Sequence, residues 1–162
     1  GRTARGVSGM RLDDGDLVIG MAVVSPEDKT VQILTVTQKG YGKRTLLDEY
    51  RVQGRGGSGV ITMKITDKNG PVVAVRQVQD EDDLIIASDR GKVIRTRVSE
   101  ISEVGRVAQG VRLISMDEGE TVGAVAKIVE KDEDHEAKNP ANPTENSAKP
   151  IENKGEGSGE TK

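Results

Sequence analysis

The fold is decided by Gln53-Gly54-Arg55-Gly56-Gly57-Ser58-Gly59-Val60, because the outline of this stretch occurs three times in the chain. Each copy reads Gly-Arg, three residues, and then Gly-Val, and the other two copies begin at Gly1 and Gly105. The copies lie 53 and 51 residues apart. Self-similarity at about 50 residues is typical of repeat proteins, in which one repeat cannot bury its apolar face alone. The glycines therefore mark a structural repeat before they mark a ligand loop.

Alternating apolar residues predict short strands on both sides of each glycine loop. The first hairpin of a repeat is expected to join residues 30–37 to 41–45, and its counterpart to join 84–88 to 92–96. The two hairpins align without a gap at an offset of 51 residues.

A second hairpin is predicted by Asn69-Gly70, because both residues of this turn accept positive φ. It would join residues 60–65 to 72–75, and its counterpart would join 111–116 to 122–126. Four strands per repeat of about 50 residues are typical of propeller blades. We therefore expect an all-β fold of β-pinwheel or propeller-like blades, each of about four antiparallel strands, in an incomplete ring with open blade faces.

The repeat and the composition together predict four segments. They are the closing part of a preceding blade at 1–24, a complete blade at 25–78, the last blade at 79–129, and an acidic C-terminal tail at 130–162. The tail should be disordered, since it cannot bury enough apolar surface to offset the entropy of ordering. It carries nine acidic and five basic residues, a net charge of −4, whereas residues 1–129 carry +1. An overall charge of −3 is therefore compatible with a polyanionic partner.

The composition restricts both the core and the chemistry. The chain has no Phe, Trp or Cys, and 33% of its residues are hydrophobic. The core must use Val, Ile, Leu and Met, and the β-branched members favour sheets. Without cysteine there is no disulfide, thiolate nucleophile or Cys-ligated metal. No run approaches the ~18 apolar residues of a membrane span, and we interpret the chain as a piece of a longer cytoplasmic protein.

Three motifs that could carry chemistry are better explained otherwise. Residues 54–59 match the dinucleotide pattern G-x-G-x-x-G, but a strand and not a helix is expected to follow them. The acidic run 80–83 lacks the spacing of a calcium loop and reads as a solvated turn. His135 lies in the acidic tail, with no serine or carboxylate placed to make it a base. We expect no catalytic, cofactor or metal site.

The basic residues favour nucleic-acid binding, because they recur in phase with the repeat. On blades related by rotation, equivalent residues fall along one rim and form a curved track of positive charge. Aromatic residues for base stacking are scarce, so the expected contact is the phosphate backbone of duplex DNA and not a single strand. The candidate DNA-binding residues are Arg2, Arg5, Lys43, Arg44, Arg51, Arg55, Lys64, Lys92, Arg95, Arg97, Arg106 and Arg112.

Several segments resemble the C-terminal domain of the DNA gyrase A subunit, in the order and spacing of that family. They are residues 40–45, 49–51, 53–59, 69–73 and 109–114. The resemblance covers residues 1–129 and implies a six-bladed β-pinwheel that wraps duplex DNA around a basic rim, in support of ATP-dependent negative supercoiling. Residues 53–59 are a degenerate form of the family's gyrase box, with Gly54 and Ser58 in place of two bases. The resemblance implies phosphate contact by Arg55.

The resemblance also implies partners and a location. The catalytic tyrosine of the family lies outside this chain, so no cofactor is expected in this fragment, and ATP and Mg would act elsewhere in the holoenzyme. The implied partners are double-stranded DNA and the other parts of an A2B2 heterotetramer, namely the rest of the gyrase A chain and the gyrase B chain. The implied location is the bacterial cytoplasm at the nucleoid, with no membrane.

Two alternatives stay open: the C-terminal domain of the A-type chain of topoisomerase IV, and a propeller-like scaffold for protein interactions.

The acidic tail is expected to compete with DNA for the basic rim, because its net charge of −4 opposes the +1 of the body. Deleting residues 130–162 should raise the affinity for duplex DNA at low salt, as measured by fluorescence anisotropy. An unchanged affinity would count against this competition.

Overall fold

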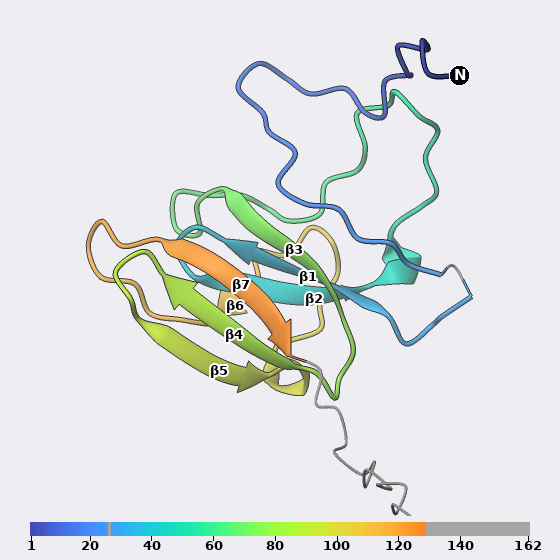
Figure 1. Cartoon of the computed structure of the whole chain (residues 1–162). Coiled ribbons are helices and arrows are strands. Elements are labelled where there is room, and N and C mark those ends of the chain that lie inside the picture. The colour runs from blue at the N-terminus through green and yellow to red at the C-terminus, as the bar shows by residue number, and fades with distance from the viewer. Residues whose placement is uncertain (26, 129–162) are drawn as a thin grey trace, which may run out of the picture. The chain divides into compact units, whose positions relative to one another are not determined.

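The computed structural model describes residues 1–25 and 27–128, so the predicted tail at 130–162 lies outside the described residues. The described chain forms strands and two short 3-10 turns, without an α-helix (Figure 1). The elements are β1 Gln32–Thr37, β2 Tyr41–Leu46, η1 Leu47–Glu49, β3 Val72–Val78, β4 Asp83–Ser88, β5 Val93–Arg97, η2 Val98–Glu100, β6 Val111–Arg112 and β7 Val122–Ile128. The predicted all-β class is confirmed. None of these helical turns is long or apolar enough to cross a membrane.

The strands form two antiparallel sheets that follow the same plan. One sheet has the order β3-β1-β2-β6 and the other has the order β5-β4-β7. The β1–β2 hairpin pairs Leu34 with Arg44, and the β4–β5 hairpin pairs Ile85 with Arg95 one repeat later. The pairing register also shifts at equivalent positions of β1 and β4. The repeat predicted from the glycine loops is therefore present in the backbone.

The second predicted hairpin is wrong in both repeats. Residues 60–65 form no strand, and β3 pairs with β1 instead. Residues 113–116 likewise form no strand, and β7 pairs with β4. The two-residue strand β6 pairs with β2, where Tyr41 lies opposite Arg112. The last repeat thus adds an edge strand to the sheet of the repeat before it.

The side chain of Asn69 explains why no hairpin forms at this turn. Its Oδ1 accepts the N–H of Thr66 at 2.8 Å, and its Nδ2 donates to the carbonyls of Lys64 at 2.9 Å and Gln109 at 3.3 Å. Asn69 is 1% exposed, so these bonds are protected from water. Local side-chain bonds of this kind compete with a strand ladder. The turn therefore closes on itself and on the next repeat.

One aliphatic core joins the two sheets. Leu34 and Val36 of β1 and Leu84 and Ile86 of β4 are fully buried in a single cluster. The other buried members of the cluster are Ala74, Val78, Val98, Ile101, Ile114, Val122 and Val125. Burying one Val, Leu or Ile side chain stabilises a fold by about 1.5–3 kcal/mol. Because both repeats contribute, two successive repeats share one core.

Residues 1–25 contain no strand and expose an apolar run. Leu17, Met21 and Val23 are exposed, and an isolated bridge joins Met10 to Gly57. The exposed apolar side chains agree with the open blade face that we expected. The assignment of residues 1–24 to a preceding blade stays a prediction, as do the other segment boundaries.

The turn before β7 repeats the Asn69 turn with a charged residue. Glu120 accepts the N–H of Asp117 at 2.8 Å and a hydrogen bond from Lys92 Nζ, also at 2.8 Å. The Glu120 side chain is only 1% exposed. The Asp117 amide and the Lys92 ammonium group favour the carboxylate and lower the pKa of Glu120 from 4.5 to about 2. The hydrogen bond to Glu120 raises the pKa of Lys92 in turn.

Acid should weaken the fold through Glu120. Because its folded-state pKa lies below the ordinary value, its contribution to stability is complete above about pH 4.5 and is lost as the pH falls towards about 2. Glu120→Gln keeps an acceptor for the Asp117 N–H but cannot titrate. Its urea unfolding midpoint should therefore change less with pH across this range than that of the unsubstituted protein. Glu81→Gln, at an exposed site, is the control and should keep the original pH dependence. Equal acid sensitivity of both variants would refute the assignment.

Candidate nucleic-acid interface

Lys43, in the middle of β2, points into the protein. Its ammonium group is fully buried and donates to the carbonyl oxygens of Gly105 at 2.6 Å and Arg106 at 2.8 Å, and to Thr45 Oγ1 at 3.1 Å. Burial lowers the pKa of Lys43 to about 8, and the nearby Glu49 carboxylate partly opposes this shift. An ammonium group has three hydrogens. All three have acceptors within the protein, so none remains for a phosphate.

Arg44 lies next to Lys43 and is 9% exposed. Its Nε donates to Ile101 O at 2.5 Å, its Nη1 to Gln32 Oε1 at 2.9 Å, and its Nη2 to Ser99 O at 3.2 Å. It also forms an ion pair with Asp80. Its guanidinium group is therefore surrounded by protein acceptors.

Lys43 and Arg44, here termed the junction pair, fasten β2 to residues 99–106 of the next repeat. The backbone continues this contact, since Arg44 N–H donates to Ser102 O at 3.2 Å and Val104 N–H donates to Arg44 O at 3.0 Å. Both residues were candidates for DNA contact. The structure places them between two repeats, where their hydrogen bonds hold the repeats together.

Glycines near the junction pair allow the repeats to approach closely. Gly110 has φ +78°, and a Cβ atom there would lie 2.6 Å from Gly42 O. Gly40 has φ +78°, and its Cβ would lie 2.4 Å from Ile114 O. Both positions therefore require glycine for conformation and for space. Gly59, the equivalent of Gly110 one repeat earlier, has nothing within 4 Å of such a Cβ. The Gly-Val step thus serves packing wherever a neighbouring strand lies against it.

Three candidates on the last hairpin are paired with carboxylates. Lys92 donates to Glu120, as described above. Arg95 forms an ion pair with Asp83, and Arg97 Nε lies 3.6 Å from the same carboxylate. Asp83 has an 8% exposed side chain. A carboxylate this close offsets much of the attraction that these bases would exert on a phosphate.

The candidates at the first two glycine loops have no side-chain partner among the described residues. They are all exposed, and they are Arg2, Arg5, Arg51, Arg55 and Lys64. Arg106, in the third loop, differs because its Nη1 donates to Ile61 O at 2.9 Å. Its Nε is buried without a partner in the described chain. The candidates without a side-chain partner thus lie at the first two glycine loops.

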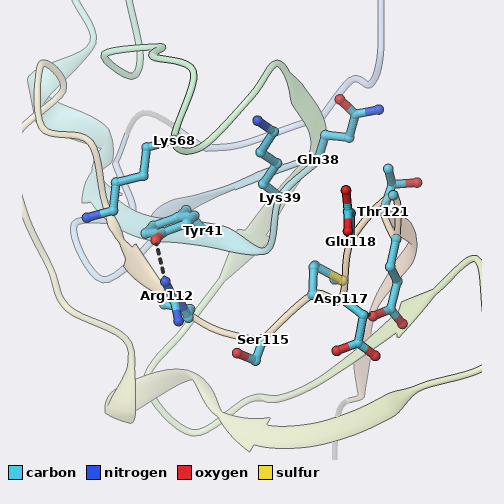
Figure 2. Close-up of a pocket in the computed structure, with 12 residues that line it drawn as sticks. Gln38, Lys39, Tyr41, Lys68, Arg112, Ser115, Asp117, Glu118 and Thr121 are labelled. Atoms are coloured by element: carbon cyan, nitrogen blue, oxygen red, sulfur yellow. Dashed lines mark hydrogen bonds between the residues drawn. The ribbon is translucent and has the colours of Figure 1, made fainter.

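The last candidate, Arg112, contacts Tyr41, a residue that the sequence analysis did not select (Figure 2). Arg112 Nη2 donates to the Tyr41 hydroxyl at 3.0 Å, and its guanidinium carbon lies 5.5 Å from the ring centroid. Lys68 Nζ lies 5.4 Å from the same centroid. The hydrogen bond from Arg112 lowers the pKa of Tyr41. Lys68 was missed because residues 67–70 were interpreted only as a turn.

The family model for the DNA gyrase C-terminal domain, beta-propeller, matches residues 1–25, 32–79 and 82–128. The DNA gyrase A subunit of Staphylococcus epidermidis is 46% identical over 133 residues, which are 82% of this chain and 15% of that protein. The DNA gyrase A subunit of Staphylococcus aureus is 46% identical over 134 residues, which are 83% of this chain and 15% of that protein. The chain thus spans about 15% of the length of these relatives.

Two solved structures share the architecture. A DNA gyrase A C-terminal domain superposes with a TM-score of 0.68 at 32% identity, over 77% of this chain and 42% of that one. The C-terminal domain of a DNA topoisomerase IV superposes with a TM-score of 0.69 at 24% identity, over 76% of this chain and 38% of that one. The second likeness concerns the fold alone.

Replacing Lys43 by Met should destabilise the junction between the repeats. The loss is expected to be about 1–3 kcal/mol at pH 7, because the carbonyl oxygens of Gly105 and Arg106 lose their donor. The folded-state pKa of about 8 lies below the ordinary 10.5. The unfolded chain therefore binds more protons between these pH values, and stability should rise with pH there. Urea unfolding at several pH values should show this rise in the unsubstituted protein and not in Lys43→Met.

Lys29→Met serves as the matched control for this experiment. Lys29 is exposed and pairs with Asp48 at 2.8 Å, an arrangement typically worth less than about 1 kcal/mol. If Lys43→Met were no more damaging than Lys29→Met, the junction pair would not hold the repeats together.

Proposed function

Because this chain belongs to the family of DNA gyrase C-terminal β-propeller domains, we propose that it binds duplex DNA through the phosphate backbone and helps to wrap it. The observation that carries this proposal is the division of the basic side chains. Bases at the inter-repeat junction and on the last hairpin have protein partners. Bases at the first two glycine loops are exposed and have no partner among the described residues. Exposed basic side chains without a protein partner are the ones available to phosphate oxygens.

The proposed phosphate contacts are the basic side chains without a partner at the first two glycine loops, together with Arg112. They are Arg2, Arg5, Arg51, Arg55, Lys64 and Arg112. A protein with 6–10 phosphate contacts loses about 10³–10⁵ in affinity between 50 and 200 mM salt. Affinity for DNA should therefore depend steeply on salt.

Wrapping needs more than binding, because duplex DNA resists bending. Bending 20–30 base pairs by 40–90° costs about 1–6 kcal/mol. We propose that further blades, aligned along the same arc, supply the contacts that offset this cost. The chain described here should bind duplex DNA weakly and wrap it poorly by itself.

The similarity to gyrase A subunits, of whose length this chain spans about 15%, supports a proposal for the role in the whole protein. We propose that the domain supports ATP-dependent negative supercoiling by a gyrase of two A and two B subunits in the bacterial cytoplasm. ATP and Mg²⁺ would act elsewhere in that enzyme. The domain itself would contribute DNA binding and not catalysis.

The gyrase assignment is favoured over the topoisomerase IV alternative by similarity. The solved gyrase domain is 32% identical to this chain and the solved topoisomerase IV domain is 24% identical. A protein-interaction scaffold is the alternative from a different functional class. A scaffold would keep its protein partners when the unpaired basic side chains are removed, whereas a DNA-wrapping domain would lose its affinity for duplex DNA.

Neutralising three of the basic side chains that have no partner should lower both the affinity for DNA and the dependence of this affinity on salt. In the triple variant Arg51→Gln, Arg55→Gln and Lys64→Gln, each lost phosphate contact should reduce the slope of log K against log salt by about 0.9. Fluorescence anisotropy with a labelled duplex, titrated at several salt concentrations, measures this slope.

The matched control removes three bases that have carboxylate partners: Lys29→Gln, Arg97→Gln and Lys127→Gln. It changes the net charge by the same amount, but its slope should stay close to that of the unsubstituted protein. Equal slopes for the two triple variants, or a flat plot for the unsubstituted protein, would reject phosphate contact through the unpaired bases.

A further inference from the structure

Tyr41 lies where two successive repeats meet, and two basic side chains converge on it. Arg112 comes from β6 of the last repeat and stands opposite Tyr41 in the strand register. Lys68 comes from the turn before β3 in the preceding repeat. Lys68 Nζ and the guanidinium carbon of Arg112 lie 5.4 and 5.5 Å from the ring centroid. Figure 2 shows both side chains beside the ring. We term Tyr41, Lys68 and Arg112 the Tyr41 cradle.

The two cations of the Tyr41 cradle have no carboxylate partner among the described residues, unlike Arg44, Arg95 or Lys92. A guanidinium group carries five N–H donors, and Arg112 uses one of its nitrogens on the Tyr41 hydroxyl. The bond fixes the direction of the guanidinium group and leaves other donors unused. Two like charges beside one ring repel each other, so a shared anion would relieve the repulsion. The Tyr41 cradle therefore has the chemistry of an oxyanion site.

The cradle opens into a pocket of about 470 Å³ whose opposite wall is acidic. Two of its carboxylates are already engaged, since Lys92 Nζ lies 2.8 Å from Glu120 and 3.3 Å from Asp117. Glu118 is exposed and has no partner among the described residues. An anion should therefore bind at the Tyr41 end of the pocket, and Glu118 should weaken it.

We propose that the Tyr41 cradle binds one phosphate of the duplex backbone at the seam between two repeats, an inference that rests on the proposed function. Lys68 and Arg112 contact the phosphate, and Tyr41 is a positioning residue that holds the guanidinium group. Because the two bases belong to different repeats, one phosphate bridges both repeats. Binding energies of coupled equilibria are reciprocal. DNA binding therefore stabilises the docked repeats, and docked repeats bind DNA more tightly.

The two tyrosines of the chain allow a direct test. The protein is labelled with 3-fluorotyrosine, and Tyr50→Phe identifies the ¹⁹F signal of Tyr41. A short duplex should shift the Tyr41 signal in proportion to the bound fraction measured by anisotropy. Inorganic phosphate at the same phosphate concentration should shift it much less, because a single phosphate lacks the neighbouring contacts. An equal shift with inorganic phosphate would show a general anion site and overturn the assignment to DNA.

The failures of the two proposals are distinguishable in this experiment. If the duplex binds and the Tyr41 signal does not move, the cradle is not a DNA contact, while the proposed function stands. If the duplex does not bind at all, both proposals fail.

Substitutions separate contact from positioning. Lys68→Gln and Arg112→Gln should each reduce the slope of log K against log salt by about 0.9. Arg112→Lys and Tyr41→Phe keep the charges but lose the bond between these side chains. They should keep the slope and weaken affinity by roughly twofold to tenfold, the effect of one ordinary hydrogen bond. Glu118→Gln should tighten binding at low salt.

Lys39→Gln is the matched control, because Lys39 lines the same pocket but donates to Asp67 O at 2.5 Å. Its slope should stay unchanged. A merely structural cradle would predict lower thermal stability in these variants with an unchanged slope. The Lys68 residue is itself exposed, so Lys68→Gln tests the proposal even if substitutions of Arg112 prevent folding. An unchanged slope in folded Lys68→Gln would overturn the proposal.

Discussion

Two successive repeats are held together by the Lys43 ammonium group, which is buried against carbonyl oxygens of the next repeat. A buried cation is tolerated only when its hydrogens have acceptors. Two of the three acceptors of Lys43 are the carbonyl oxygens of Gly105 and Arg106. One repeat therefore completes the polar interior of the repeat before it. In the last repeat the equivalent position is Ile94, which needs no acceptor. Within the described residues, the lysine thus stands at the position to which the next repeat supplies acceptors.

The contact between repeats places the basic residues in two groups: those covered by the next repeat and those at the surface. Their charge alone does not distinguish the two groups. Arg44 and its equivalent Arg95 occupy the same place in their hairpins. Their side chains are 11% and 55% exposed, because residues 99–106 cover only the first. The same residue type therefore serves the junction in one repeat and lies at the surface in the next. Under the proposed function, the phosphate backbone contacts basic side chains that have no carboxylate partner among the described residues, such as Arg55.

The sequence predicts those parts of the fold that depend on local pattern. The aliphatic core and the hairpins β1–β2 and β4–β5 follow from composition, alternation and the repeat. The second hairpin was wrong because Asn69 bonds to Thr66 and Lys64 within its own turn, and also to Gln109, a residue of the next repeat that no local signal brings near. The sequence pattern also did not predict the burial of Lys43. Every residue of Tyr41–Thr45 is buried, so both faces of the strand are covered and the usual alternation of exposure is lost.

The most direct test of this account is to label lysine side chains with an acetylating reagent, with and without duplex DNA, and to locate the modified residues by mass spectrometry. Lys64 and Lys68 should be labelled in the free protein and protected by the duplex. The paired and exposed Lys29 should be labelled in both states, and buried Lys43 in neither. Protection of Lys29 with continued labelling of Lys64 and Lys68 would contradict the account.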